Sequence, residues 1–520
     1  MDEKFVAAVH AAFPASDATI TLGAPVLAGE CHPEPLVRVS LAMLTRHGLI
    51  AGATGTGKTK TLQLMAEQLS AAGVPVFVAD IKGDVSGMGA AGTPNDRITQ
   101  RAKDTGWNWQ GAPFPVEYLS LTGARGAQLR ATVSSFGPLL LAKVLGLNET
   151  QTSVLSLVFK YCDDKKLALL DFSDLRAVLQ YLTDEGAADL KDYGGMSKAT
   201  VGVLLREMVG LEQQGAGKFF GEPAFELDDL LQTERDGRGL VSVLELADTQ
   251  DKPALFSTFM MWMLASLYHQ LPEVGDIDKP KLVFFFDEAH LLFDSASKDF
   301  LAQVDQVVRL IRSKGVGLFF ITQSPKDIPA DILGQLGNRV QHALRAFTPD
   351  DQKALAAAAR TFPKTPFYDI AETLTSSGIG EALVTVLTPS GAPTPPVLTR
   401  MVPPGSRMGP LTDAEMTQRL GASQQVKEYA QGVDRESARE MLAARMTRDA
   451  AGNGGDAQQG EADEKQAPAP SALDGLAGAL NSPLVKTIAG RATTQILRGL
   501  MGAMLGTPAR RRSSRSRSIF

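Results

Sequence analysis

Residues 52–59 read GATGTGKT and match the phosphate-binding pattern G-x-x-x-x-G-K-[ST]. The apolar stretch HGLIAG (47–52) leads into them and predicts a strand, and the amphipathic stretch KTLQLMAEQLSAAG (60–73) follows and predicts a helix. A strand, a glycine-rich turn and a helix in this order are the context that the motif requires. The stretch therefore predicts an α/β fold that binds a nucleotide through its phosphates.

The residue types in this loop suit ATP bound together with Mg²⁺. The glycines let the backbone fold closely, so that amide N–H groups and the start of the helix face phosphate oxygens. Lys58 is predicted to neutralise the β and γ phosphates, and the Thr59 hydroxyl is predicted to ligate Mg²⁺. The predicted nucleotide-binding residues are Gly52, Ala53, Thr54, Gly55, Thr56, Gly57, Lys58, Thr59 and Lys60.

Further apolar stretches predict the other strands of a doubly wound, mainly parallel sheet. They are VPVFVAD (74–80), GLVSVLEL (239–246), KLVFFFDEAH (281–290), GLFFITQS (317–324) and EALVTVL (381–387). Near-continuous apolar runs suit strands that are covered on both faces, and helical patterns lie between several of them. About 160 residues separate the first two of these stretches. Apolar residues at helical spacing within this gap predict a large helical insertion over residues 90–235.

Two carboxylates follow the predicted strand in FFFDEAH (284–290), at the sheet edge where such folds bind ligands. Asp287 is the expected partner of Mg²⁺, usually through water. Glu288 is expected to orient and deprotonate the water that attacks the γ-phosphate. His290 is expected to be a structural residue without a catalytic role.

The next predicted strand ends in Thr322 and Gln323, and the Gln323 amide is expected to contact the γ-phosphate or the catalytic water. The amphipathic helix before it carries Arg309 and Arg312 near its end. Arg312 is the first candidate for an arginine finger that stabilises transition-state charge, and Arg309 is the second. Both arginines would equally complement the dipole of their helix.

Weaker candidates lie near other strand ends. Arg339 and Arg345 are alternative arginine fingers. In DIKGD (80–84), Asp80 or Asp84 either reaches the ligand crevice or is a solvated loop acid.

Composition restricts the classes of protein to which the chain can belong. The 52 basic and 58 acidic residues give a net charge of −6, which argues against a uniformly basic nucleic-acid binder. The two cysteines are too few for a disulfide framework or a cysteine-rich zinc site, and the N-terminus lacks a secretory signal, so we expect a cytoplasmic protein. The uncharged stretch ALFSTFMMWMLASLYHQL (254–271) is interpreted as a buried core helix rather than a membrane span.

The composition changes after residue 390, so the core is expected to end near residue 400. The predicted order is a short N-terminal segment (1–45), the ATPase core (46–400), a helical extension (401–449), a disordered linker (450–472), a Gly/Ala-rich helix (473–506) and a basic tail (507–520). Three roles of the basic tail remain open from the composition. It either keeps the protein soluble, contacts nucleic-acid phosphates or contacts an anionic membrane.

The letters DEAH name a class of RNA helicases that carry two RecA-like lobes in one chain. After Leu387 only about 130 residues remain, and they show no further strand-rich pattern. A second lobe is therefore not expected. An arginine finger would come from a neighbouring subunit, which implies a ring.

GATGTGKTKT, FFFDEAHLLF and RSKGVGLFFITQSPKDIP resemble the HerA-FtsK group of P-loop ATPases. In that group a Gln follows the fourth core strand, and an Arg eleven residues earlier is the finger; Arg312 and Gln323 have this spacing. The helical insertion and the segment NRVQHALRAFTPDD (338–351) are most similar to bacterial HerA-like proteins of unknown function. The resemblance covers about residues 15–400, with weaker similarity as far as residue 506. It implies a RecA-like core and a homo-oligomeric ring, hexameric in the group, that translocates double-stranded DNA.

The chain departs from archaeal HerA before the phosphate loop. About 45 residues stand there, fewer than the N-terminal β-barrel of that family needs, so a nuclease partnership that depends on the barrel is not part of the expectation. Two functions remain open. One is a ring-forming ATPase that moves or remodels DNA, and the other is a nucleotide-dependent assembly or switch ATPase that acts on a protein or membrane partner without DNA.

Overall fold

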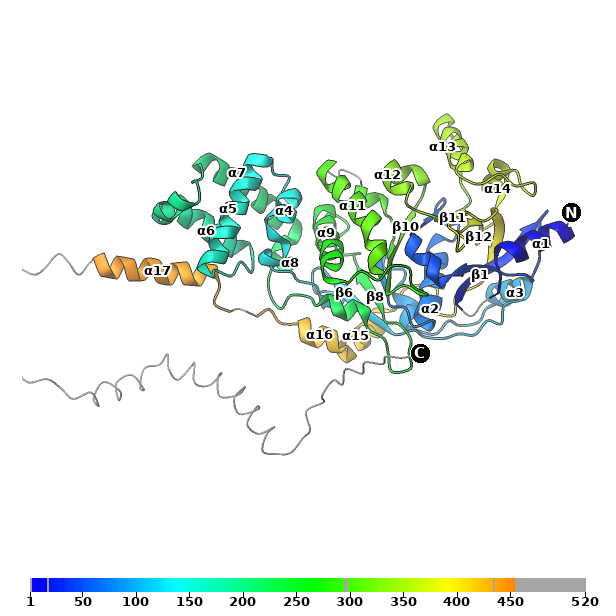
Figure 1. Ribbon diagram of the computed structural model, residues 1–520. Coiled ribbons are helices and arrows are strands. Elements are labelled where there is room, and N and C mark those ends of the chain that lie inside the picture. Colours follow the sequence, from blue (N-terminus) through cyan, green and yellow to red (C-terminus); the bar gives the residue numbers. More distant parts are fainter. Residues whose placement is uncertain (1, 16–17, 294–297, 434, 454–520) are drawn as a thin grey trace, which may run out of the picture. The chain divides into compact units, whose positions relative to one another are not determined.

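The computed structural model describes residues 2–15, 18–293, 298–433 and 435–453 (Figure 1). Contacts divide the chain into one unit, Met1–Arg448, and a second, Asp449–Phe520, of which only the end of a helix is described. The predicted Gly/Ala-rich helix and basic tail, and all but the start of the predicted linker, lie outside the described residues.

Parallel strands form the centre of one large mixed sheet, in the order β11-β4-β10-β9-β5-β8-β6-β7. They are β4 (Gly48–Ala51), β5 (Val76–Asp80), β6 (Val116–Ser120), β7 (Ala127–Gln128), β8 (Val241–Glu245), β9 (Leu282–Phe286), β10 (Val316–Thr322) and β11 (Asn338–His342). The apolar stretches thus form strands as predicted, and the parallel α/β core is confirmed. Because the strands are parallel, β4, β5, β9 and β10 present their carboxyl ends, and the polar residues after them, at one edge.

The sheet continues beyond β11 with antiparallel strands. They are β12 (Glu381–Thr385), β13 (Val397–Met401), β1 (Thr19–Leu27), β2 (Glu30–Cys31) and β3 (Val37–Ser40). EALVTVL therefore forms a strand, but antiparallel to its neighbour β11. Residues expected as a separate N-terminal segment are instead strands of the core sheet. Gly23 and Pro25 interrupt the apolar pattern of β1, and a Cβ at Gly23 would lie 2.1 Å from the Arg400 carbonyl oxygen.

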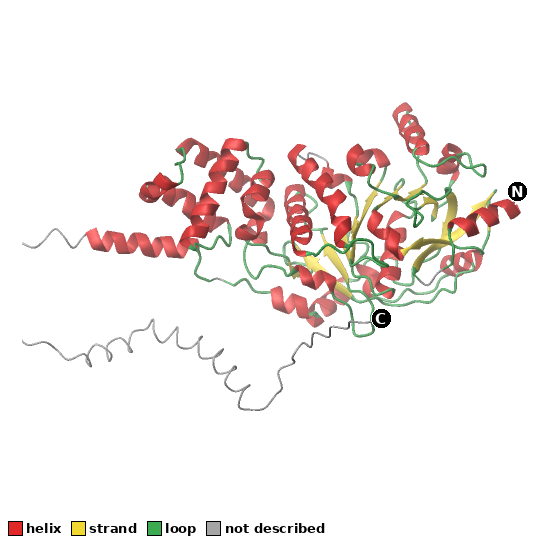
Figure 2. Ribbon diagram, in the orientation of Figure 1, coloured by secondary structure: helices red, strands yellow, loops and turns green. Residues whose placement is uncertain are grey.

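Helices cover both faces of the sheet, which Figure 2 shows as yellow strands flanked by red helices. The two faces follow the two-residue period of the strands. Phe284 and Phe286 of β9 pack on the side of α9 and α11, and Phe285 packs on the side of α1 and α2. The helices outside the insertion, up to β13, are α1 (Asp2–Ala12), α2 (Lys58–Ala71), α3 (Asp96–Thr105), α9 (Pro253–Gln270), α10 (His290–Phe293), α11 (Lys298–Ile311), α12 (Ala330–Leu333), α13 (Pro349–Arg360) and α14 (Ile370–Ser376).

The uncharged stretch at 254–271 forms α9, and most of its side chains are buried in the core, as predicted. Within the described part of the chain, no helix combines the length and the apolar character that crossing a membrane requires. Short 3-10 or π turns connect the longer elements. They are η1 (Leu41–Arg46), η2 (Ser86–Gly89), η3 (Glu185–Asp192), η4 (Glu212–Ala216), η5 (Leu227–Leu231), η6 (Arg312–Lys314) and η7 (Pro325–Asp327).

The expected insertion is helical from residue 133 onward. It contains α4 (Val133–Val144), α5 (Glu149–Lys165), α6 (Phe172–Thr183), α7 (Lys198–Leu211) and α8 (Gly217–Phe219). Before residue 133 the prediction was only partly right, because α3 is helical but β6 and β7 join the core sheet. β6 has five residues, of which the first two are only partly buried, so its sequence VEYLS carries little strand signal. Phe136 and Trp262 stack with ring centroids 6.4 Å apart and join α4 to α9.

A buried carboxylate of α2 anchors the segment after β13. Glu67 accepts hydrogen bonds from the amides of Gly405 and Ser406, at 2.7 and 3.1 Å, and from the Ser406 hydroxyl at 2.9 Å. Burial raises the pKa of Glu67 to about 7, against the effect of these bonds. The chain then forms α15 (Asp413–Ala422), α16 (Gln424–Tyr429) and α17 (Ala438–Asn453) where a helical extension over 401–449 was expected.

Candidate functional site

The phosphate loop joins β4 to α2, and its glycines adopt the backbone angles that the motif requires. Gly52, Gly55 and Gly57 have φ of 154°, 78° and 118°, in the region that L-residues avoid. A Cβ at Gly52 would also meet the His342 Cβ at 2.5 Å. The loop therefore needs glycine for both its angles and its packing.

Lys58, the first residue of α2, folds back over the loop. Its Nζ donates to the carbonyl oxygens of Gly52, at 2.8 Å, and Ala53, at 3.2 Å. Burial lowers the pKa of the ammonium, against the opposing charges of Glu288 and Asp287. Lys58 and Thr59 stand in the first turn of α2, where unpaired backbone N–H groups favour an anion.

The acidic pair after β9 lies at the same edge of the sheet. Asp287 is 2% exposed, and its Oδ2 has no hydrogen-bond partner among the described residues. Glu288 is 5% exposed and has φ of 46°, an uncommon angle for a residue other than glycine. Its amide donates to Asp287 Oδ1 at 3.0 Å.

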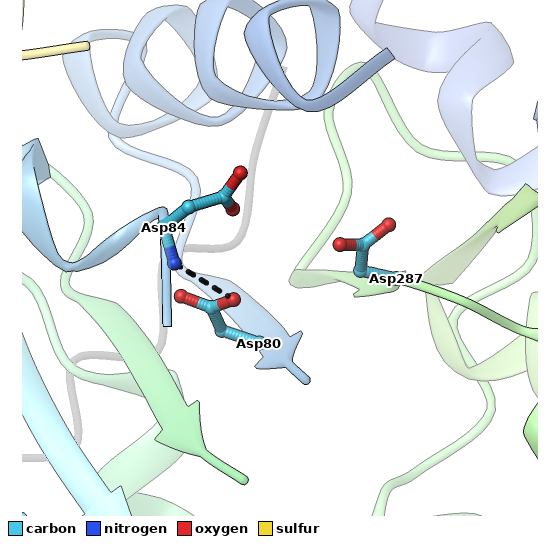
Figure 3. A group of neighbouring side chains, drawn as sticks. All are labelled: Asp80, Asp84 and Asp287. Atoms are coloured by element: carbon cyan, nitrogen blue, oxygen red, sulfur yellow. Dashed lines mark hydrogen bonds between the residues drawn. The ribbon is translucent and has the colours of Figure 1, made fainter. Parts of the chain in front are cut away.

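The loop after β5 brings two more carboxylates to Asp287. The carboxyl oxygens of Asp80, Asp84 and Asp287 lie within 4.8 Å of one another (Figure 3). The sequence allowed two positions for Asp80, at the ligand crevice or in a solvated loop. The side chain is fully buried. Burial raises the pKa of Asp287 to about 7, reinforced by the charges of Glu288 and Asp80. Asp80 and Asp287 are buried and Asp84 is half-buried, and together they form one carboxylate group beside the phosphate loop.

Lys82, from the same loop as Asp80, forms an ion pair with Glu288 Oε1. Burial alone would raise the pKa of Glu288, but the hydrogen bond and charge of Lys82 hold it below its usual value. His290 Nδ1 lies 3.4 Å from Glu288 Oε2. Lys82 is absent from the sequence-based candidates. The available signal was its position two residues after a strand that ends at the predicted crevice.

Gln323 follows β10 and faces a cleft of about 340 Å³ that Ala53 and Thr54 of the phosphate loop also line. Asp327 holds this turn, because its carboxylate accepts from the Thr322 hydroxyl at 2.7 Å and from the Ser324 amide at 2.9 Å. Arg345 and the 86% exposed Phe347 line the same cleft.

Arg312 does not join the other candidates. It lies four residues before β10 begins, whereas the phosphate loop lies at the other end of that strand. Seven strand residues span roughly 20 Å at about 3.3 Å each, which separates Arg312 from its own phosphate loop. Its Nη2 contacts Asp276 Oδ1 at 3.3 Å, and Arg309 pairs with Asp305 at 3.0 Å. Arg339 is also distant from the loop, since it stands near the start of β11.

A second cavity, of about 350 Å³, opens beside Gly57 and Lys60. Its walls are largely apolar and come from α3, the residues before β12 and the segment after β13. They include Ile98, Arg101, Ile379, Met401, Val402 and Pro403. Arg101 fixes one wall by donating to the carbonyl oxygens of Ile379, at 2.9 Å, and Gly380, at 3.1 Å. No sequence signal had placed this Pro-rich segment near the phosphate loop.

A known protein family matches most of the chain. The family model described as "Helicase HerA-like C-terminal" matches residues 27–512. The DNA double-strand break repair helicase HerA of Saccharolobus solfataricus is 20% identical over 353 residues, which cover 67% of this chain and 63% of that protein. HerA of Sulfurisphaera tokodaii is 23% identical over 360 residues, covering 67% and 64%. The chain thus spans slightly less than two thirds of these relatives.

Among solved structures, the unbound monoclinic form of the bacterial conjugative coupling protein TrwBdeltaN70 is similar with a TM-score of 0.49 and 14% identity. The alignment covers 76% of this chain and 91% of that one.

Proposed function

We propose that this chain, which belongs to the helicase HerA-like C-terminal family, hydrolyses ATP at the edge formed by its phosphate loop and the carboxylates after β5 and β9. The observation that carries the proposal is the convergence of Lys58, Asp287 and Glu288 at this edge, with Glu288 held in its charged form by Lys82. Nucleotide binding alone does not require a strained, charged carboxylate at this position, whereas activation of a water molecule does.

In this mechanism the amides of the phosphate loop hold the phosphates, and the Lys58 ammonium exchanges its carbonyl partners for phosphate oxygens. Asp287 and Thr59 offer oxygen ligands for Mg²⁺, and the partnerless Asp287 Oδ2 fits that demand. Mg²⁺ would supply charge neutralisation on the phosphates. Glu288 accepts a proton from the attacking water, and the Gln323 amide orients that water. The apolar cavity beside Lys60 receives the nucleoside.

We further propose that the chain assembles into a ring and moves or remodels double-stranded DNA. The position of Arg312 supports a ring, because its guanidinium lies at the far end of β10 from its own phosphate loop. A role as arginine finger therefore requires the phosphates of a neighbouring subunit. The family match and the named function of the HerA relatives support DNA as the partner.

Duplex DNA is expected to stimulate ATP hydrolysis by the full-length chain, and the stimulation should weaken as salt rises because counterions compete for the DNA phosphates. Steady-state ATPase assays at several salt concentrations, together with mass measurement with and without ATP, test this. A ring whose hydrolysis no nucleic acid changes would favour the alternative, an assembly or switch ATPase that acts on a protein or membrane partner.

Replacing Lys82 with Met is expected to shift the acidic limb of the kcat–pH profile to higher pH. The general base must be deprotonated, and without the cation its burial raises its pKa, so a higher pH is needed for the active form. Lys82→Arg retains the charge and should keep the limb near its original position. An acidic limb unchanged in Lys82→Met would show that Lys82 does not control the base.

A further inference from the structure

The group formed by Asp80, Asp84 and Asp287 has the features of a cation site that exists before nucleotide arrives. We propose that these three carboxylates bind one divalent cation in the nucleotide-free protein. The inference rests on the proposed function only in sharing Asp287. It adds Asp80 and Asp84 as ligands and cation binding that is independent of ATP.

The geometry of the group suits a small, hard cation. The three carboxyl groups each place an oxygen within 4.8 Å of the other two, a spacing that one ion can bridge (Figure 3). Asp287 Oδ2 and Asp84 Oδ1 are both buried atoms without a hydrogen-bond partner among the described residues. Buried acceptors are ordinarily satisfied, so two partnerless oxygens from the segments after β5 and β9 indicate a missing ligand.

Asp80 and its loop present these oxygens in a fixed arrangement. Asp80 Oδ1 accepts from the amides of Gly83, at 2.8 Å, and Asp84, at 3.3 Å, and Oδ2 accepts from the Val85 amide at 2.8 Å. These bonds hold the backbone that carries Asp84. Each carboxylate oxygen has a second lone pair, so Asp80 can ligate a cation while it keeps these bonds.

The neighbouring lysines are engaged with other groups. Lys82 pairs with Glu288, Lys58 donates to the carbonyl oxygens of Gly52 and Ala53, and Lys60 donates to Gln63 Oε1 at 3.4 Å. Three carboxylates from the carboxyl ends of β5 and β9 thus converge where no side-chain ammonium forms an ion pair with them among the described residues. Divalent cations with oxygen ligands are the partners that such a set prefers.

Mn²⁺ titrated into the nucleotide-free, full-length protein tests the site, with free Mn²⁺ followed by electron paramagnetic resonance. One Mn²⁺ should bind per chain, and Mg²⁺ should compete with it. Asp84→Asn keeps the side-chain shape and should weaken binding at least about tenfold, because removing even an outer-shell partner costs this much. The matched control Asp305→Asn, on α11, should bind Mn²⁺ as the wild type does.

Lys58→Ala separates this inference from the proposed ATPase. It should lose ATP binding yet retain the Mn²⁺ site, because Lys58 donates its described hydrogen bonds to the carbonyl oxygens of Gly52 and Ala53 and not to the three carboxylates. Mn²⁺ binding that requires nucleotide, or that is unchanged in Asp84→Asn, would overturn the inference while leaving ATP hydrolysis intact. Mn²⁺ bound by a wild-type protein that cannot hydrolyse ATP would support the inference and refute the proposed ATPase.

Discussion

Glu288→Gln is expected to lower the turnover of ATP by roughly two to four orders of magnitude while ATP still binds, because general-base catalysis contributes about this much. The amide is nearly isosteric but cannot take a proton from water. Lys58 and Asp287 stay in place, so the nucleotide is trapped. Single-turnover hydrolysis and equilibrium binding of ATP, measured on the same preparation, separate the two steps.

The surroundings of Glu288 make this experiment specific. Its carboxylate contacts Lys82 and His290, and its backbone has a left-handed φ. The substitution also removes the ion pair, so a folding control is needed. The thermal unfolding transition should therefore be recorded for Glu288→Gln beside Glu185→Gln, an exposed position in the helical insertion that should hydrolyse ATP normally. Normal hydrolysis by a folded Glu288→Gln protein would remove Glu288 from the catalytic assignment.

Local patterns made much of this site predictable. The loop at 52–59 needs only adjacent residues, and the Asp287–Glu288 pair needs only the end of an apolar strand. Parallel strands bring both to one edge, so the common strand direction is enough to associate them, whatever the strand order. The helical insertion beyond residue 133 and the buried helix α9 were predictable for the same reason, since each shows a period that one segment contains.

Features that depend on pairing between distant segments were not predictable. The Lys82–Glu288 ion pair requires β5 and β9 to be adjacent in the register Ala79 to Phe286, which neither segment encodes alone. β1 was missed because Gly23 and Pro25 break its pattern, although Gly23 is required for the approach of β13. The apolar cavity depends on the segment after β13, which is held in place by its hydrogen bond to Glu67 of α2. Each case reflects tertiary contact overriding local pattern.

Arg312→Ala is expected to lower ATP hydrolysis by roughly 10³ to 10⁵, the range over which arginine fingers act. The residue lies far from its own phosphate loop, so a loss of this size means that the guanidinium acts on a neighbour. Arg312 is 38% exposed and its partner Asp276 is 85% exposed. Such an exposed pair contributes little to stability, so Arg312 can leave it for a phosphate at small cost.

Arg309→Ala is the matched control, because Arg309 lies on the same helix and pairs with Asp305 within one turn. It should retain hydrolysis if Arg312 alone is the finger. A large loss in Arg309→Ala with normal hydrolysis in Arg312→Ala would reverse the assignment of the two arginines.

Mixed rings decide whether Arg312 acts in trans. Arg312→Ala and Glu288→Gln subunits are each inactive alone, but in a co-assembled ring some interfaces join an intact Glu288 to an intact Arg312 of the adjacent subunit. Random equal mixing should restore about a quarter of wild-type hydrolysis, since one interface in four carries both groups. If Arg312 served its own chain, every subunit would lack one of the two groups, and mixing would restore nothing. Recovery therefore requires both an assembly of subunits and a site that they share, which makes a single measurement of mixed activity a test of the assembly as well as of the residue.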